Sequence, residues 1–438
     1  MPFARQLFRY TPVFLALALG CGGAAQAQVA VPGKAKAPVA QGTSPLPLDE
    51  LRTFTEVLDH IKSSYVEPVD DKTLLENAIK GMLNNLDPHS SYLGPKDFRE
   101  LEESTSGEFG GIGIEVGVES GALKVISPID DTPAANAGIE AGDIILGLDG
   151  KPAKDMSLTS AVDMMRGKPG TQLRLTIGRH GRKPFDRVLT RAVIKVHSVR
   201  SRLLEKGYGY LRISQFQVNT GSEVTKALNK LRKENGQRLC GLVLDLRNNP
   251  GGVLQAAVET VDSFLKKGLI VYTKGRMANS EMSFYADPAD PSEGVPLVVL
   301  INGGSAAAAE IVAGALQDQK RGVLMGTQSF GKGSVQPVLP LSGDRALKLT
   351  TALYYTPKGR SIQAEGITPD IEVPRARVTR ENDQDGPHEA DLQRHLKNTK
   401  GDEYQHSDTQ DQASPLDGDY QLSQALNLLK GLNITRGK

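Results

Sequence analysis

The sequence predicts an α/β protein built from several domains. Between residues 198 and 375 short apolar runs alternate with helical patterns, in the order GLVLDLR, VLQAAVETVDSFL, LIVYTKG, VPLVVLI and AAAAEIVAGAL. This alternation is typical of helices layered on a sheet. The chain has 438 residues, of which 39% are hydrophobic and 24% charged, so it can form two or three domains and bury a substantial core.

The N-terminus has the layout of a secretory signal. Arg5 and Arg9 precede the apolar run VFLALALG, and the small-residue segment AQA follows it, so we expect cleavage after Ala27. Lipidation of Cys21 is the alternative. Without Arg5 and Arg9 the chain has 50 basic and 51 acidic side chains, a balance that argues against a nucleic-acid partner. No later segment reaches the ~18 apolar residues of a transmembrane span.

The remaining chain divides into regions of different character. Apolar residues recur at helical spacing in LRTFTEVLDHIKSSYV and LLENAIKGMLNNL, whereas the next segment has short β-rich runs divided by glycines. A polar, turn-rich segment precedes the last helical pattern, DYQLSQALNLLKGL. We therefore expect a signal peptide (1–27), a Pro/Ala-rich leader (28–47), a helical region (48–100), a β-rich module (104–190), the α/β core (191–375), a linker (376–414) and a C-terminal helix (415–438).

Two glycine turns in the core are candidates for a reactive site. DLRNNPGG (245–252) follows a strand and precedes a helix, where glycine N–H groups can stabilise a developing negative charge; a plain β-to-α turn is the alternative. NGGSAAAAEI (302–311) repeats this arrangement, which resembles the elbow where α/β hydrolases present a nucleophile. The alternative is a helix whose small residues allow close packing.

A third segment, GTQSFGKGSVQ (326–336), offers Lys332 as a base. Its first seven places fit a phosphate-binding loop, but Gly333 stands where serine or threonine should hold magnesium, which argues against a nucleotide site. A desolvated lysine loses its proton readily and can act as a general base. Residues 198–387 contain no histidine, which excludes a serine/histidine/aspartate triad and a histidine-rich metal site within this domain.

Together these motifs resemble those of the carboxyl-terminal processing peptidases, also called tail-specific proteases. The likeness runs from about Leu48 to the C-terminus and rests on LDPHSSYL, FGGIGIEV, GDIILGLDG, MMRGKPGT, DLRNNPGG, AEIVAGALQD, FGKGSVQ and GITPDIEV. It implies a PDZ domain inserted before a crotonase- and Clp-like serine protease core that needs no metal or cofactor. It further implies a periplasmic endopeptidase that cuts proteins with apolar C-termini, a homo-oligomer joined by the N- and C-terminal helices, and a lipoprotein adaptor.

The resemblance also implies a serine/lysine mechanism. Carried over by motif, Lys332 is the base, Gln336 positions it, and the backbone of Gly251 or Gly252 helps to stabilise the oxyanion.

The nucleophile is where the sequence departs from the family. Members usually read GSASASE, with the middle serine catalytic and 25 residues before the lysine, and here that place is Ala307. Ser305 matches the first, non-catalytic serine. We therefore expect the chain as written to be inactive, and the intact remainder of the site favours a recent or introduced serine-to-alanine change over a long-decayed pseudoenzyme. A peptide-binding scaffold without catalysis is the alternative function.

The β-rich module carries a candidate peptide-binding loop in FGGIGIEV. A glycine turn there can aim N–H groups at a terminal carboxylate, and the strand after it can pair with a peptide as an added β-strand. Its candidate binding residues are Gly111, Ile112, Gly113 and Ile114; a glycine-rich hairpin without a ligand is the alternative. Arg166, in MMRGKPGT, is a candidate bridge between this module and the core.

Overall fold

The computed structural model describes residues 46–119, 121–129, 131–376, 394, 396 and 418–435. The expected signal peptide, nearly all of the leader and nearly all of the linker lie outside these residues, so those predictions stand as made. The chain divides into two units, one ending at Leu74 and the other beginning at Leu75. No helix among the described residues is long and apolar enough to cross a membrane.

The first unit consists mainly of helix α1 (Leu48–Ser64) and the start of α2 (Asp71–Asn84). No residue of α1 is buried. Its apolar side chains at helical spacing include Leu51, Phe54 and Val57, which are exposed, and Leu58, which is partly buried. This helix therefore presents an apolar stripe that its own unit does not cover.

The second unit begins with the rest of α2 and leads into the β-rich module. Helix α3 (Pro95–Ser106) ends at Gly107, whose φ of 73° gives the left-handed C-cap that glycine adopts readily. The module is one antiparallel sheet in the order β3-β4-β5-β7-β8, with β6 paired to β5. Its elements are β3 (Ile114–Glu119), β4 (Ala122–Pro128), α4 (Pro133–Asn136), β5 (Ile144–Leu148), β6 (Lys151–Pro152), a 3-10 turn (Ala153–Asp155), α5 (Leu158–Met165), β7 (Gln172–Gly178) and β8 (Phe185–Thr190).

Strands β2 (Glu108–Gly111) and β9 (Ala192–Lys195) pair antiparallel where the chain enters and leaves the module. The module has its own buried apolar cluster, which includes Leu148, Leu173 and Leu175. Its entry and exit strands therefore lie together, as in a domain inserted into a longer chain.

The core is built on a six-stranded sheet in the order β10-β11-β12-β15-β16-β21. Strand β10 is antiparallel to β11 and the other pairs are parallel. Every residue of β12 and β15 is buried, as expected for central parallel strands covered on both faces. The strands are β10 (Val199–Glu205), β11 (Tyr208–Ile213), β12 (Gly241–Asp245), β15 (Leu297–Ile301), β16 (Val323–Gly326) and β21 (Ile371–Glu372).

Two smaller sheets complete the second unit. One has the order β14-β13-β20-β17, and the other has the order β1-β19-β18. The latter joins the last three residues of LDPHSSYL to residues more than 250 positions later, because Ser91 pairs with Lys348. Their strands are β13 (Leu269–Gly275), β14 (Ser283–Tyr285), β17 (Ser334–Val335), β20 (Ala352–Tyr355), β1 (Ser91–Leu93), β18 (Val338–Leu341) and β19 (Arg345–Lys348); a 3-10 turn covers Ala278–Ser280.

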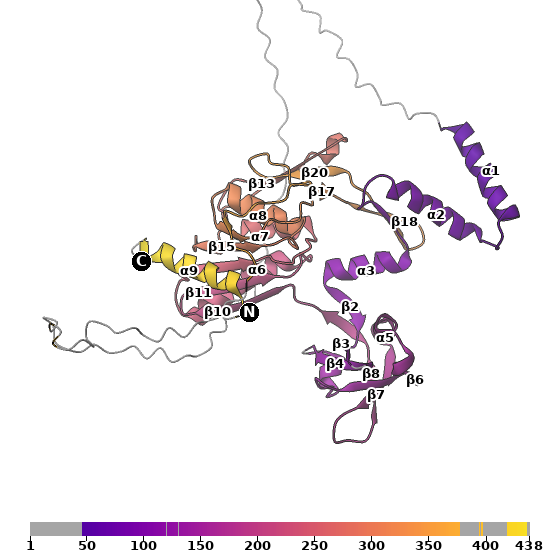
Figure 1. Cartoon of the computed structure of the whole chain (residues 1–438), viewed down its shortest axis with the longest axis horizontal. Coiled ribbons are helices and arrows are strands. Elements are labelled where there is room, and N and C mark those ends of the chain that lie inside the picture. Colours follow the sequence, from indigo (N-terminus) through magenta and orange to yellow (C-terminus); the bar gives the residue numbers. More distant parts are fainter. Residues whose placement is uncertain are drawn as a thin grey trace, which may run out of the picture. The chain divides into compact units, whose positions relative to one another are not determined.

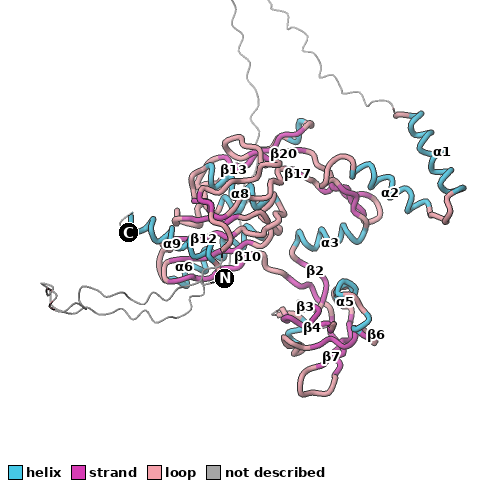
Figure 2. Tube along the Cα trace, in the orientation of Figure 1, coloured by secondary structure: helices cyan, strands magenta, loops and turns pink. Residues whose placement is uncertain are grey.

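Helices cover both faces of the six-stranded sheet (Figure 1 and Figure 2). Helices α6 (Thr220–Asn235), α7 (Leu254–Asp262) and α8 (Ala308–Asp318) share one large buried cluster with the strands. Helix α9 (Tyr420–Thr435), yellow in Figure 1, contributes Leu422, Ala425 and Leu429 to a second cluster with Val243, Val298 and Leu300. The predicted mixed α/β class is confirmed.

The C-terminal helix buries its apolar stripe within its own chain. Arg247 of the DLRNNPGG turn forms a bidentate pair with Asp419, at 2.8 and 2.7 Å, just before α9 begins. Burial raises the pKa of Asp419, but the hydrogen bonds and charge of Arg247 outweigh this effect and hold it below its usual value. The apolar stripe of α9 thus packs on the sheet of its own chain. The role in joining subunits that the family resemblance implied for this helix stays a prediction.

Removing α9 is expected to destabilise the core. A chain ending at Asp417 loses the cover over Val243 and Val298 and leaves Arg247 without Asp419, so its free energy of unfolding should fall by about 3 kcal/mol or more. Urea denaturation followed by circular dichroism measures this, with a chain ending at Thr435 as the matched control. If both chains unfold at the same urea concentration, the packing of α9 contributes no stability. Sedimentation of the two chains would then test whether α9 joins subunits instead.

Candidate active site

The three core motifs lie at one edge of the sheet. Strands β12, β15 and β16 are parallel neighbours, so their carboxyl ends meet there. DLRNNPGG begins at the end of β12, NGGSAAAAEI at the end of β15 and GTQSFGKGSVQ at the end of β16. Topology therefore joins segments that are about 25 to 80 residues apart in sequence, at the edge where open α/β sheets bind ligands.

Ala307 occupies a strained turn at the start of α8. Its φ of 48° and ψ of −110° are rarely adopted by a residue with a side chain, and such strain is characteristic of reactive positions. The residues on either side of it are buried, whereas Ala307 is partly exposed. The fold thus presents the Ala307 side chain at the surface of the loop, as a nucleophile elbow does.

Asparagines join the DLRNNPGG turn to the Ala307 loop. The carbonyl oxygen of Asn249, which is fully buried, accepts a hydrogen bond from the N–H of Ala306 at 2.9 Å. Its side-chain oxygen accepts from the N–H of Gly251 at 2.9 Å, and its Nδ2 donates to the carbonyl of Ile213 at 2.9 Å. The Nδ2 of Asn302 donates to the Oδ1 of Asn248 at 2.9 Å. These bonds hold the two turns in a fixed relation.

Gly251 fits closely against the Ala307 position. A Cβ atom at residue 251 would lie 2.8 Å from the Cβ of Ala307, and its φ is 100°, so only glycine is tolerated there without a shift. The Gly251 carbonyl accepts from the N–H of Phe216, and in a trans peptide the N–H of Gly252 points the opposite way, away from Phe216. The Gly251 N–H is bonded to Asn249, which leaves the Gly252 N–H as the better oxyanion donor of the two.

Glu310, which is fully buried, connects the Ala307 loop to the lysine segment. One carboxylate oxygen accepts from the N–H groups of Ala307 at 2.9 Å and Lys332 at 2.8 Å. The other accepts from the Ser329 hydroxyl and the Gly331 N–H, each at 2.6 Å. The backbone nitrogens of Ala307 and Lys332 therefore donate to the same carboxylate oxygen, which holds the nucleophile position close to the base.

Lys332 lies partly buried after β16. Burial lowers the pKa of its amine and the nearby charge of Lys348 lowers it further, while Asp87 raises it by a smaller amount. A lysine with a lowered pKa is available as a base closer to neutral pH. Gln336 donates from Nε2 to the hydroxyls of Ser334 and Thr350, both at 3.3 Å. No hydrogen bond joins Gln336 to the Lys332 amine among the described residues.

The geometry argues against Ser305 as a substitute nucleophile and against residues 326–333 as a phosphate-binding loop. Ser305 is fully buried and its hydroxyl donates to the Leu246 carbonyl at 2.8 Å, so it cannot replace a serine at position 307. The N–H groups of Gly331 and Lys332 donate to Glu310. The next element is the short strand β17, whereas a helix follows a phosphate-binding loop. A phosphate-binding loop needs those N–H groups free. No group of three or more metal-ligating side chains occurs in the described residues.

The predicted peptide-binding loop lies between β2 and β3. Gly111 ends β2, and Ile112 is 2% exposed, with its carbonyl bonded to the N–H of Ala134. Gly113 has a φ of 78° and packs on Thr132, whereas Ile114 opens β3. In the described sheet β3 pairs with β4 alone, so its other edge is open to an added strand. The side chain of Ile112 belongs to the core of the module, which restricts that residue to a backbone role.

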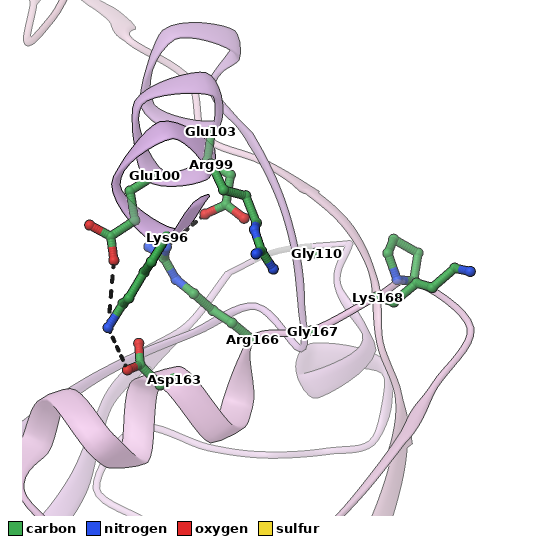
Figure 3. Close-up of a pocket in the computed structure, with 10 residues that line it drawn as sticks. Lys96, Arg99, Glu100, Glu103, Gly110, Asp163, Arg166, Gly167 and Lys168 are labelled. Atoms are coloured by element: carbon green, nitrogen blue, oxygen red, sulfur yellow. Dashed lines mark hydrogen bonds and ion pairs between the residues drawn. The ribbon is translucent and has the colours of Figure 1, made fainter. Parts of the chain in front are cut away.

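Arg166 contacts α3 instead of the α/β core. Figure 3 shows its guanidinium extended toward Glu103, with which it forms an ion pair at 2.7 Å, and it also stacks over Phe109 at 5.1 Å. Lys96 pairs with Asp163 at 2.9 Å beside it. The two ion pairs line a cavity of about 610 Å³ between α3 and the end of α5. The predicted bridge from Arg166 thus ends on α3.

Sequence reasoning missed Glu310 and Asn249. An acidic residue three positions after a helix start in an otherwise apolar helix was a usable signal for Glu310.

The fold and the site define a serine-type peptidase core that carries a PDZ domain. Family models match as peptidase family S41 at residues 207–373, as a PDZ domain at 110–184 and as the N-terminal domain of the activating protease CtpB at 22–96. The carboxy-terminal-processing protease of Bartonella bacilliformis is 48% identical over 386 residues, 87% of this chain and 88% of that protein.

A second relative, the carboxy-terminal processing protease CtpA of Bacillus subtilis, is 35% identical over 321 residues, 73% of this chain and 68% of that one. A solved photosystem II D1 C-terminal processing protease is 32% identical, with a TM-score of 0.44 over 73% of this chain and 86% of that one. The chain belongs to the carboxyl-terminal processing protease family, whose members are serine-type peptidases.

Proposed function

We propose that this chain is a serine/lysine endopeptidase that cuts proteins near their C-termini and whose nucleophile position holds alanine. The observation that carries the proposal is the Glu310 carboxylate, which binds the N–H of Ala307 and the N–H of Lys332 at once. That contact aligns the place of the nucleophile with the place of the base. As written, the chain binds substrate and does not cleave it.

With serine at position 307 the reaction needs only groups that the chain already has. The neutral Lys332 amine takes the hydroxyl proton as the oxygen attacks the peptide carbonyl, and the developing oxyanion accepts from the N–H of Gly252 and from the N–H of Ala308 at the start of α8. Lys332 then gives its proton to the leaving amine as the peptide bond breaks. A water molecule next attacks the acyl-serine ester and gives a proton to Lys332, which returns it to the serine oxygen as the acyl product leaves. Gln336 orients the base through its amide.

The PDZ domain is proposed to hold the substrate's C-terminal residues against β3 as an added strand. Gly111, Ile112, Gly113 and Ile114 offer backbone groups to the peptide, and the family resemblance favours substrates with an apolar C-terminus. The second candidate function, a peptide-binding scaffold without catalysis, is favoured by Ala307 itself and shares this binding step.

Export and assembly are also proposed. The N-terminal pattern of Arg5, Arg9 and the apolar run supports a cleaved signal and a periplasmic location. The exposed stripe of α1 supports a homo-oligomer in which that stripe meets a second copy. A lipoprotein adaptor remains part of the proposal by family likeness alone.

Binding without cleavage is the expected behaviour of the chain as written. A protein with an apolar C-terminus should bind with a measurable affinity and stay intact, because the peptide-binding edge of β3 does not depend on residue 307. Isothermal titration and gel analysis of the same mixture measure both properties. The matched control is the same protein ending in two aspartates, which should bind at least about tenfold more weakly. Cleavage by the unmodified chain would refute the role given to Ala307.

A further inference from the structure

The LDPHSSYL motif folds into a turn whose Asp87 carboxylate is saturated with hydrogen bonds. One oxygen accepts from the N–H groups of His89 at 2.8 Å and Ser90 at 2.9 Å, and the other accepts from the Ser90 hydroxyl at 2.6 Å. Burial opposes ionisation, yet these donors lower the pKa of Asp87 to about 2. Asp87 therefore carries a negative charge throughout the pH range in which a lysine base operates.

The turn is fixed to the strand region that follows Lys332. Ser90 is 3% exposed, and its hydroxyl oxygen accepts from the N–H of Thr350 at 3.0 Å. The next residue, Ser91, pairs with Lys348 in the β1-β19 ladder. These two contacts fix the turn beside Lys348 and Thr350.

Thr350 connects Ser90 to Gln336. Its side-chain oxygen accepts from the Nε2 of Gln336 at 3.3 Å, and Ser334 accepts from the same nitrogen at 3.3 Å. Since Nε2 is the donor end of the amide, these contacts leave the carbonyl oxygen as the atom that can accept a hydrogen bond from an ammonium group. A continuous chain of contacts therefore runs from Asp87 through Ser90 and Thr350 to Gln336.

Three charged or titratable side chains lie close enough to Lys332 to interact electrostatically with it. Asp87 and His89 come from the turn and Lys348 comes from β19. Burial and the Lys332 charge lower the pKa of His89, so that imidazole is neutral near pH 7. The negative charge of Asp87 and the positive charge of Lys348 then have opposite effects on the pKa of the Lys332 amine.

We propose that residues 87–90 are a positioning element of the serine/lysine site, in which Ser90 and Thr350 orient the Gln336 amide and Asp87 supplies a fixed negative charge beside Lys332. The proposal rests on the proposed function, because it gives Lys332 the role of the base. It assigns a task to a motif that lies outside the α/β core in sequence, more than 240 residues before the lysine.

The first test measures Lys332 directly in the full chain with Ala307, so it does not depend on activity. Lysine side chains are isotope-labelled, the Lys332 NMR signal is identified by its loss in Lys332→Arg, and its titration midpoint is compared between variants. Asp87→Asn should move the midpoint to lower pH, because the protonated amine loses a favourable charge. Asp290→Asn is the matched control, since Asp290 also precedes a proline and accepts from the hydroxyl of Ser292. An unchanged midpoint in Asp87→Asn overturns the proposal.

The second test uses chains that also carry Ala307→Ser. Thr350→Val keeps the backbone N–H bonded to Ser90 but removes the oxygen that holds Gln336, so kcat should fall by about ten- to a hundredfold with little change in KM. Thr350→Ser should recover most of this loss, and Thr351→Val is the neighbouring control. A kcat unchanged in Thr350→Val contradicts the positioning role. If Ala307→Ser itself is inert, the proposed function fails, and the NMR titration still decides this proposal.

Discussion

Ala307→Ser should convert the inert chain into a protease in a single step. The loop already holds the strained backbone angles of a nucleophile, Glu310 bonds the N–H groups of both residue 307 and the base, and the Gly252 N–H is in place. Cleavage of a protein with an apolar C-terminus should rise by roughly a thousandfold or more over the unmodified chain. Loss of the full-length substrate on a gel and the masses of the fragments measure it.

The matched control is Ala309→Ser. This change also adds one hydroxyl, two residues further on in the first turn of α8, but residue 309 is fully buried, so the variant should remain inert. Adding Lys332→Ala to Ala307→Ser should return activity to background, and the two changes should not be additive because nucleophile and base act as one unit. Replacing Gln336 should cost less, since it orients the base and exchanges no proton.

The pH dependence of the active variant follows from Lys332. Its neutral form is the base, so kcat/KM should rise with pH as the amine loses its proton. Burial and Lys348 lower the pKa of this amine, and the rise should therefore be centred below the ordinary range of lysine. If Ala307→Ser stays inert while the chain still binds peptide, the peptidase proposal fails and the scaffold function stands.

The sequence predicted the parts of this site that depend on local pattern. Apolar runs that end in glycine turns marked the carboxyl ends of β12, β15 and β16, because strand ends and glycine turns are local signals. Spacing and family likeness then selected Ala307 and Lys332. The burial of Asn249 and the partners of Asp87 were out of reach, since those contacts join residues far apart in sequence.

The C-terminal helix illustrates the same limit. The stripe containing Leu422 and Leu429 showed that α9 must bury one face, which the structure bears out. A periodic pattern does not contain the identity of the surface that covers it. Arg247 and Asp419 are 172 residues apart in sequence, so no local pattern indicated that they form an ion pair.

Glu310→Gln should destabilise the core more than any other isosteric change in the site. The native carboxylate accepts from two donors at each oxygen, whereas glutamine has one acceptor oxygen and an amide nitrogen that can only donate. In one orientation that nitrogen meets the N–H groups of Ala307 and Lys332. In the other it meets the N–H of Gly331 and the Ser329 hydroxyl, which can turn to accept from it. At least one buried N–H is left unsatisfied, which costs about 1 to 3 kcal/mol.

Denaturation in urea measures this loss, with Glu365→Gln as the matched control. Glu365 lies exposed in a neighbouring loop, so its replacement should change the free energy of unfolding by less than about 0.5 kcal/mol. In chains that also carry Ala307→Ser, Glu310→Gln should abolish cleavage even where the protein remains folded, because Ala307 and Lys332 lose their shared partner. Equal stability and equal cleavage in the two glutamine variants would show that the strained loop holds its shape without Glu310, and that the geometry of the nucleophile position comes from Asn249 and Gly251 instead.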